Sequence, residues 1–102
     1  MPPTYDIDAS FADDWKKLPE NQKTEFKAAR QTMKLDFQTS HGKSVTFSPS
    51  LRIKGVRGTE GVFEMTWAGD GRATFQYGDE RIPGHPHIIW RRIGTHDIFK
   101  RP

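Results

Sequence analysis

The stretch VFEMTWAGDGRATFQY, residues 62–77, decides the fold of this chain. Each of its halves alternates apolar and polar side chains, which is the period of a half-buried β-strand. Between the halves stands Gly69-Asp70-Gly71, a strong signal for the turn of a β-hairpin. The alternation places one set of apolar side chains on a single face of the hairpin: Phe63, Met65, Trp67, Ala73, Phe75 and Tyr77.

Two further segments extend the hairpin into a sheet. Leu51–Val56 is a predicted strand, and it is followed by a turn over Arg57–Gly61. A loop over Gly78–Pro86 leads to a last strand, His87–Ile93, which ends at Gly94. These segments together predict an antiparallel meander.

The N-terminal half has mostly the period of helices. Thr4–Asp8 alternates as a short strand does, and Ser10 is the predicted N-cap of a short helix after it. Pro19 breaks that helix and opens a longer one, because proline suits the first turn and not the interior. Two apolar stripes mark the helices: Phe11, Trp15 and Leu18, then Phe26, Ala29, Met33 and Phe37. The polar segment Ser40–Ser50, which contains His41, is a connection.

The order of these elements predicts an α+β fold, formed by residues 1–102 as a single domain. We expect the N-terminal strand and the two helices to pack on one face of a twisted antiparallel sheet. The other face is then open to solvent.

Composition narrows the class of protein. The chain has no Cys, which excludes a disulfide scaffold, a Cys zinc site and thiol catalysis. No apolar run approaches the roughly 18 residues that span a membrane. The start, MPPTYDIDAS, has no features of a secretory signal, so we expect a cytoplasmic protein.

The positive charge lies in the second half of the chain. Residues 1–50 carry seven Lys/Arg and seven Asp/Glu. Residues 51–102 carry nine Lys/Arg, seven of them Arg, against six Asp/Glu, which gives the whole net charge of +3. Arg binds phosphate as a planar fork, so this excess suits a nucleic-acid partner. An ordinary solubility charge is the alternative.

The same alternation predicts which side chains face away from the helices. On the first strand these are Arg52 and Lys54. On the central strands they are Val62, Glu64, Thr66, Arg72, Thr74 and Gln76. In the last strand either Arg91 or Arg92 faces outward, depending on a register that the sequence leaves open.

A cationic face with one carboxylate suits RNA cleavage. Attack by a 2′-hydroxyl needs a general base, cations beside the phosphorus and an acid for the leaving oxygen. Glu64 is the candidate base, and His96 in the tail is the candidate acid. Solvated residues on a polar sheet face are the alternative. A three-histidine metal site of His85, His87 and His96 is a weaker alternative, and we predict no metal.

Five segments stand in a characteristic order along the chain. They are Phe11–Pro19 (FADDWKKLP), Leu51–Gly55 (LRIKG), Gly61–Trp67 (GVFEMTW), Gly71–Tyr77 (GRATFQY) and Ile89–Phe99 (IWRRIGTHDIF). In this ordered set the chain resembles the RelE/ParE superfamily of toxins from type II toxin–antitoxin pairs. The resemblance implies two helices packed on a twisted sheet. It also implies metal-independent cleavage of mRNA in the ribosomal A site, with no cofactor.

The resemblance also implies roles for single residues. Arg72 matches an arginine that stabilises the transition state, and His96 matches a histidine that acts as general acid or base. Phe99 matches an aromatic that stacks on a nucleotide, although it lacks the hydroxyl found in some members. Glu64 matches no motif, and it could instead hold Arg72 or Lys54 as an ion-pair partner. The RNA-binding set from strand register and resemblance is Arg52, Lys54, Arg57, Arg91 and Phe99.

The resemblance implies partners as well. A cognate antitoxin, small and acidic or partly disordered, would cover the sheet face or displace the C-terminal segment. The other partners would be mRNA in the ribosomal A site and 16S rRNA, with no membrane and no small-molecule cofactor. Two alternatives remain: a gyrase-poisoning toxin of the same fold, and a non-toxic relative that only binds its antitoxin.

Overall fold

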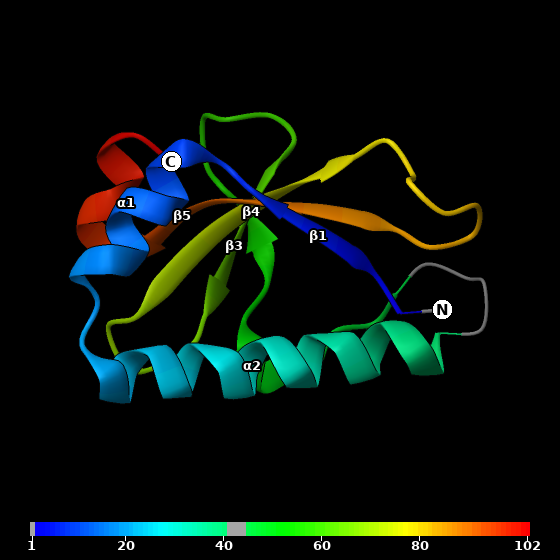
Figure 1. The fold of residues 1–102 in the computed structure, drawn as a ribbon, viewed down its shortest axis with the longest axis horizontal. Helices are drawn as coiled ribbons and strands as arrows, with labels where there is room; N and C mark the ends of the chain where they lie inside the picture. Colours follow the sequence, from blue (N-terminus) through cyan, green and yellow to red (C-terminus); the bar gives the residue numbers. More distant parts are fainter. Residues whose placement is uncertain (1, 41–44) are drawn as a thin grey trace.

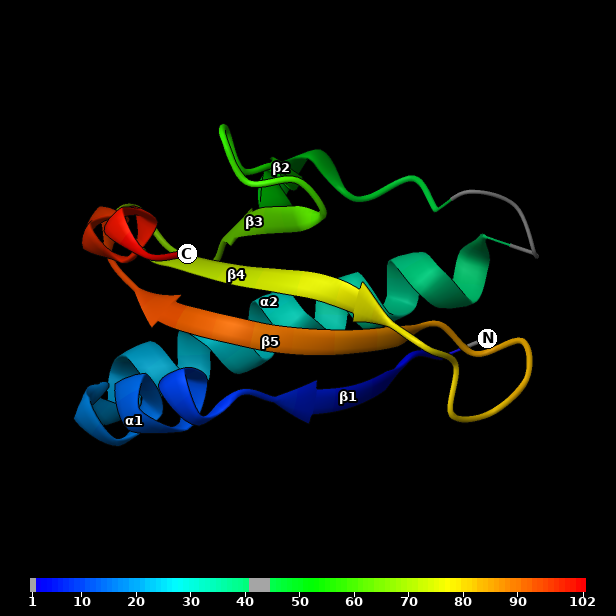
Figure 2. The ribbon, with the colours of Figure 1, turned by 90° about the horizontal axis from the view of Figure 1, so that it is seen from above.

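The computed structural model describes residues 2–40 and 45–102, so His41 lies outside the described residues. Its strands form one five-stranded sheet in the order β1-β5-β4-β3-β2, and both α-helices pack against it (Figures 1 and 2). The predicted α+β class is thereby confirmed. The elements are β1 (Thr4–Ile7), α1 (Ala9–Lys17), α2 (Glu20–Thr39), the 3₁₀ turn η1 (Pro49–Leu51), β2 (Lys54–Gly55), β3 (Val62–Thr66), β4 (Arg72–Gly78), β5 (His87–Gly94) and the 3₁₀ turn η2 (His96–Lys100).

The first strand differs from the prediction. β1 is a member of the sheet and pairs in parallel with β5, with Tyr5 opposite Ile88 and Ile7 opposite Trp90. The expectation of a purely antiparallel sheet, with the N-terminal strand packed on its face, is therefore wrong, and the sheet is mixed. Parallel neighbours need a long crossover, and here the helices and the meander between β1 and β5 provide it.

The helices follow the predicted pattern. Pro19 ends α1 and is the N-cap of α2, and Leu18 before it is extended, with a ψ of 130°. α1 begins at Ala9 with Asp8 as its N-cap, so the predicted cap at Ser10 is wrong by two residues. The two apolar stripes face the sheet, and Phe11, Phe26 and Met33 are buried.

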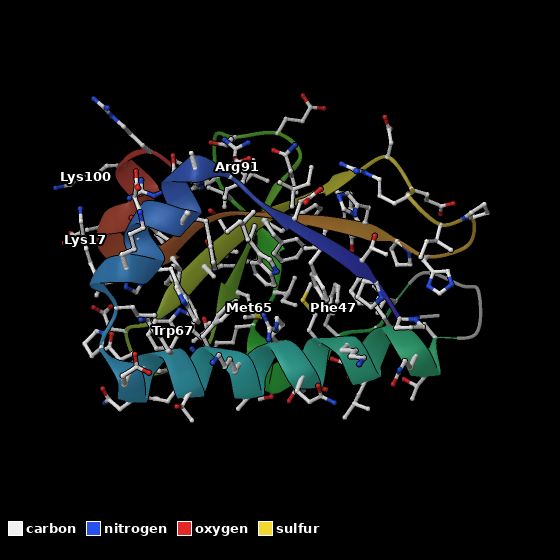
Figure 3. The ribbon with its side chains drawn as sticks, viewed as in Figure 1. Lys17, Phe47, Met65, Trp67, Arg91 and Lys100 are labelled. Atoms are coloured by element: carbon white, nitrogen blue, oxygen red, sulfur yellow. The ribbon has the colours of Figure 1, made fainter. Side chains whose placement is uncertain are left out.

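The core lies between α2 and the sheet. Figure 3 shows Met65 and Trp67 on the side of the sheet that faces α2 and Arg91 on the opposite side. Phe75 and Met65 have no exposed surface, as the alternation in the hairpin predicted. Tyr77 is the exception, because it is 42% exposed, although its ring lies at 80° and 79° to the rings of Phe63 and Phe75.

The predicted strand Leu51–Val56 is mostly wrong. Its first residues form η1, and Arg52 then adopts a left-handed conformation with a φ of 48°. That conformation breaks the alternation, so the strand is reduced to Lys54–Gly55.

A bulge in β5 settles the register of the last strand. Phe75 pairs with Trp90 while Thr74 pairs with Arg92, so Arg91 is one residue more than β4 can match. The extra residue lets both Trp90 and Ile93 reach the helix-facing core. As a result Arg91 and Arg92 both face away from α2, where the sequence predicted one of them.

The second face of the sheet is only partly open. Thr74 and Val62, expected to face solvent, are 0% and 4% exposed. The C-terminal segment folds back over this face, and the Thr74 hydroxyl donates to the main-chain oxygen of Pro102 at 3.5 Å. Among the described residues, no helix is long and apolar enough to cross a membrane.

Candidate functional site

A row of side chains crosses the second face of the sheet. The register places Lys54 opposite Glu64, Glu64 opposite Thr74, and Thr74 opposite Arg92. With neighbouring strands about 4.8 Å apart, this row spans about 14 Å. Lys54 and Glu64 form an ion pair with an Nζ–Oε1 distance of 3.7 Å. The Glu64 carboxylate therefore has the partner that the sequence left as an alternative to catalysis.

Asp14 of α1 holds Arg92 in a fixed orientation. Arg92 donates from Nε to Asp14 Oδ2 at 2.6 Å and from Nη2 to Asp14 Oδ1 at 3.1 Å. The main-chain N–H of Ile93 donates to the same Oδ2 at 3.1 Å. The hydrogen bond and the charge of Asp14 raise the pKa of Arg92, although burial lowers it. This pair ties α1 to the end of β5.

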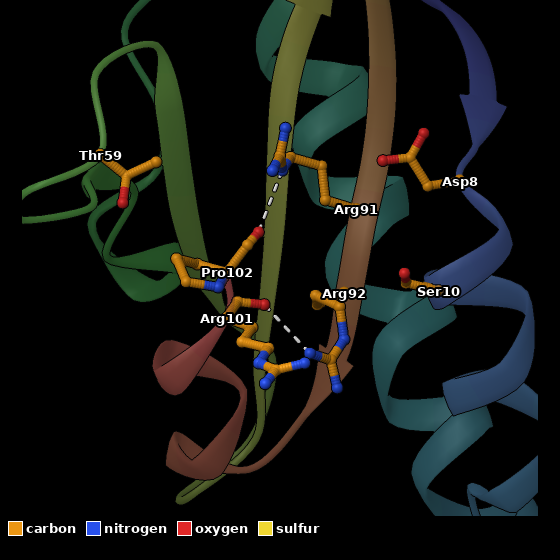
Figure 4. Close-up of a pocket in the computed structure, with 7 residues that line it drawn as sticks. All are labelled: Asp8, Ser10, Thr59, Arg91, Arg92, Arg101 and Pro102. Carbon is orange, nitrogen blue, oxygen red and sulfur yellow. Dashed lines mark hydrogen bonds between the residues drawn. The ribbon is translucent and has the colours of Figure 1, made fainter.

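Arg91 lies at the edge of a pocket of about 410 Å³ (Figure 4). It donates from Nε to the main-chain oxygen of Pro102 at 3.0 Å and from Nη1 to the Gln76 side chain. Arg92 donates to the main-chain oxygen of Arg101 at 3.0 Å. Three guanidinium groups thus gather around one polar pocket, an arrangement suited to phosphate. The pocket is lined by Asp8, Ser10, Thr59, Arg91, Arg92, Arg101 and Pro102.

A second cluster forms where the β3–β4 turn meets η2. Asp70 in the turn and His96 in η2 lie 2.5 Å apart, measured from Oδ1 to Nδ1. Arg72 donates from Nη1 to the main-chain oxygens of Gly69 and Gly71 at 3.1 and 3.0 Å, so its guanidinium lies against the same turn. The Phe99 ring packs edge-on to His96, with ring centres 5.6 Å apart.

The contact with Asp70 fixes the role of each nitrogen in the His96 ring. A carboxylate only accepts, so Nδ1 carries the hydrogen that the contact needs. Nε2 is then left for a substrate: as an acceptor when the ring is neutral and as a donor when it is protonated. Both side chains are more than half exposed, so a ligand can reach them.

The structure brings together most of the predicted site residues. Arg72, His96 and Phe99 meet at the β3–β4 turn, while Lys54 and Glu64 lie in the row across the sheet. Arg91 borders the pocket, and Arg57 is exposed in the loop that also supplies Thr59 to that pocket.

Arg52 stays apart from the other predicted residues. It borders a separate hollow with Ala29 and Thr32 of α2 and with Trp67. The strand alternation that predicted its outward position does not apply, because the main chain of Arg52 is left-handed and not extended.

Three charged residues of this site were missed by sequence reasoning. Asp70 was identified only as part of a turn, because nothing local shows that residue 70 meets residue 96. Asp14 was not singled out, because nothing local shows that residue 14 meets residue 92. Arg101 carried no signal at all, since its place depends on how the C-terminal segment folds back.

The histidines cannot form the alternative metal site. His87 begins β5 and is buried, with Nδ1 2.6 Å from the Thr4 hydroxyl and Nε2 3.1 Å from Asp6. His96 follows the other end of that eight-residue strand, about 25 Å away at 3.3 Å per residue. No cluster with the ligands for a metal ion occurs among residues 2–40 and 45–102.

Comparison with known proteins finds similarity in structure alone. No family model and no curated protein matches the sequence. The toxin–antitoxin complex DinJ-YafQ from E. coli contains a chain that superposes with a TM-score of 0.67 at 11% identity, covering 95% of this chain and 96% of that one. A conserved hypothetical protein from Helicobacter pylori gives 0.60 at 16% identity, with 95% and 97% covered.

A third solved structure extends the similarity to an archaeal complex. The RelB-RelE antitoxin–toxin complex from Methanococcus jannaschii matches with a TM-score of 0.57 at 17% identity, and 92% of this chain and 93% of that one are covered. Nearly the whole of each chain takes part in these superpositions. This chain therefore has the RelE-like toxin fold found in the DinJ-YafQ and RelB-RelE complexes.

Proposed function

We propose that this protein is the cytoplasmic toxin of a toxin–antitoxin pair, an endoribonuclease that cleaves mRNA in the ribosomal A site. The observation that carries the proposal is the Asp70–His96 pair, placed on the same turn as Arg72 beside a sheet face rich in arginine. A fold alone hosts many functions, so the argument depends on this arrangement of groups.

The chemistry is an internal transfer at phosphorus. The 2′-oxygen forms a bond to the adjacent phosphorus while the bond from phosphorus to the 5′-oxygen breaks. The products are a 2′,3′-cyclic phosphate and a free 5′-hydroxyl. One proton leaves the 2′-hydroxyl and one joins the 5′-oxygen, and the protonated His96 ring supplies the second from Nε2. Glu64 accepts the first proton if substrate separates it from Lys54.

The cations would stabilise the charge that develops on the phosphoryl oxygens. Arg72 would take this role once its guanidinium exchanges the carbonyls of Gly69 and Gly71 for phosphate. Arg91, Lys54 and Arg57 would hold neighbouring phosphates. Phe99 would stack on a base, a contact that contributes about 1–3 kcal/mol in other complexes.

A cognate antitoxin is part of the proposal. Two of the similar structures, DinJ-YafQ and RelB-RelE, are complexes between a toxin and its antitoxin. An acidic antitoxin segment over the arginine-rich face would exclude RNA by competing for the same guanidinium groups.

The test is primer extension on mRNA held in purified translating ribosomes. We expect the wild-type protein to cleave in the A site, with and without EDTA. His96→Ala should lower the cleavage rate about 10²–10⁴-fold, the usual contribution of a general acid or base. Arg72→Ala should lower it about 10²–10³-fold.

Matched variants control for folding and charge. His85→Ala and Arg81→Ala remove the same residue types from the β4–β5 loop, and we expect them to cleave as the wild type does. Cleavage that survives both His96→Ala and Arg72→Ala would discard the site. A folded wild-type protein that leaves mRNA intact but inhibits DNA gyrase would replace the nuclease with the gyrase alternative.

A further inference from the structure

A second hollow, of about 420 Å³, lies on the helix side of the sheet, between β1, α1 and α2. It is separate from every residue assigned to RNA cleavage. Its walls are mostly aromatic, which is unusual for the surface of a small protein. The lining is Tyr5, Ile7, Phe11, Ala12, Trp15, Lys16, Phe26, Arg30 and Trp90.

The polar side-chain groups of this hollow are hydrogen-bond donors, and only the Tyr5 hydroxyl among them can also accept. Lys16 and Arg30 are exposed at its rim, and neither makes an ion pair within the described part of the chain. The Nε1 of Trp90 and the hydroxyl of Tyr5, which can donate or accept, are buried without a partner there. No carboxylate side chain belongs to the lining. The hollow therefore suits a ligand that is apolar and carries oxygen acceptors.

Further cations surround the hollow. Lys23 and Lys27 of α2 lie over the Trp15 ring, 5.6 and 5.9 Å from its centre. Arg30 lies over the Phe26 ring, 5.9 Å from its centre. Burial raises the pKa of Tyr5, and the charge of Arg30 lowers it. The local field thus favours an anionic partner.

β1 supplies a second way to bind the same partner. It is an edge strand, and within residues 2–40 and 45–102 its only strand partner is β5. The N–H groups of Thr4 and Asp8 donate to main-chain oxygens of Pro86 and Trp90, both at 2.9 Å, so these residues point their main chain toward β5. Because main-chain direction alternates along a strand, the N–H and C=O groups of Tyr5 and Ile7 point to the free edge.

Tyr5 and Ile7 therefore serve both features at once. Their main-chain groups line the free edge, and their side chains line the hollow. A strand added to this edge would place its alternate side chains on the same face as theirs. Ile7 is 55% exposed, and such a strand would cover it.

We propose that the β1 edge and its hollow bind an extended acidic segment of a partner protein, with the pattern acid-x-apolar-x-acid. The apolar side chain fills the hollow, and the flanking carboxylates contact Lys16 and Arg30. The intervening residues are neutral or basic, because Asp6 lies on the other face of β1 and Asp8 directly follows the strand. This inference rests on the proposed function in one respect: the antitoxin is the partner that we expect to carry this segment.

The test is an NMR titration of the ¹⁵N-labelled protein with acetyl-Thr-Glu-Thr-Leu-Thr-Glu-Thr-amide. We expect saturable shifts of the amide N–H groups of Tyr5 and Ile7 and of the indole N–H groups of Trp15 and Trp90. Lys16→Glu and Arg30→Glu should each weaken binding roughly 3–10-fold, since each replaces an exposed attraction by a repulsion. Lys17→Glu is the matched control, because it makes the same change one residue away and outside the hollow.

Methylation of the peptide nitrogens tests the strand pairing without changing the protein. Alternate N–H groups of an added strand point toward β1, and the others point to solvent. Methylation of one alternate set should abolish binding, and methylation of the other should leave it intact. An equal response to both sets would overturn the strand pairing.

Three results would overturn the proposal as a whole. They are the absence of saturable shifts at millimolar peptide, equal binding when the peptide leucine is serine, and equal weakening by Lys17→Glu and Lys16→Glu. The ribosome assay separates the two proposals. If the protein cleaves mRNA but does not bind the peptide, the proposed binding surface is refuted and the nuclease stands. If it binds the peptide but does not cleave mRNA, the nuclease is refuted and the binding surface stands.

Discussion

Asp14 joins α1 to β5 and orients one arginine of the pocket. Its carboxylate accepts two hydrogen bonds from Arg92 and one from the Ile93 main chain. Hydrogen bonds to a charged group contribute more than neutral ones, and losing them leaves donors on β5 unpaired. The position of Arg92 in the pocket therefore depends on Asp14, which does not itself line the pocket.

Replacing Asp14 by alanine should destabilise the protein measurably. We expect Asp14→Ala to lower the free energy of unfolding by about 2–3 kcal/mol, measured by urea denaturation. Asp13→Ala is the control, because Asp13 is adjacent and exposed and should change stability by less than about 0.5 kcal/mol. Equal effects of the two variants would show that the Arg92 contact is not what stabilises α1.

The two tyrosines should titrate above their ordinary range. Burial raises the pKa of Tyr5, with Arg30 lowering it in part, and burial raises the pKa of Tyr77. The folded protein therefore holds these protons more tightly than the unfolded chain, whose phenols ionise near pH 10. The stability they contribute is complete below pH 10 and is lost as the pH rises through the folded pKa values.

The phenolate absorbance of folded and urea-unfolded protein measures this difference. We expect the folded midpoint to lie at higher pH. In a Tyr77→Phe background, Arg30→Ala should raise the remaining midpoint further, because it removes the charge that favours the Tyr5 phenolate. Coincident midpoints in folded and unfolded protein would contradict the partial burial of the Tyr5 and Tyr77 rings.

At the residue scale the sequence predicted identities better than contacts. Arg72, His96 and Phe99 were singled out, and the structure brings them to one turn. The partners that orient them, Asp70 above all, could not be predicted because the pairs are far apart along the chain. Glu64 was placed on the correct face, but only the structure shows its contact with Lys54.

At the scale of elements, the β3–β4 turn is held by a close approach of its own residues. A Cβ atom at Gly71 would lie 2.5–2.7 Å from the Trp67 ring, whereas a Cβ at Gly69 would meet nothing within 4 Å. Gly71→Ala must therefore displace the indole or the turn that carries Asp70 and Arg72.

This difference gives a paired test of the turn. We expect Gly71→Ala to cost about 1–3 kcal/mol of stability, the usual cost of overpacking. It should also reduce mRNA cleavage, because the turn positions Asp70 against His96. Gly69→Ala should change neither quantity appreciably. Thermal unfolding and primer extension on both variants measure the two effects, and unchanged cleavage in Gly71→Ala would show that the turn does not position the site.

Elements with a regular period were predicted well, and irregular ones were not. The hairpin and both helices follow directly from their apolar spacing. The left-handed Arg52 and the bulge at Arg91 each interrupt a period, and no residue type in either place demands the interruption. Both depend on tertiary packing, since the bulge brings Trp90 and Ile93 into one core.

At the scale of the whole molecule, the excess of positive charge should govern RNA binding. The logarithm of the binding constant should fall linearly with the logarithm of the salt concentration. Lys54→Ala and Arg91→Ala should each reduce the slope by about 0.7, the value for one phosphate contact on a single strand. Arg81→Ala, beyond the far end of β4, should leave the slope unchanged.

Fluorescence anisotropy with a labelled RNA at several salt concentrations measures these slopes. A slope that is unchanged by Lys54→Ala and Arg91→Ala but falls for Arg81→Ala would place the RNA at the other end of the sheet.

The overall class and the two layers were predictable from the order of helices and strands. The place of β1 was not, because its alternation fits any neighbour in a sheet.

The parallel pairing of β1 with β5 also sets the order in which the protein can be completed during its own synthesis. Residues 4–7 are made well before their partners, residues 87–90. Until then β1 has no neighbour, Asp14 has no Arg92 and Asp70 has no His96. Contacts so distant in sequence form slowly even in a finished chain. A nascent chain of this protein therefore stays without its assembled site until residue 96 has left the ribosome.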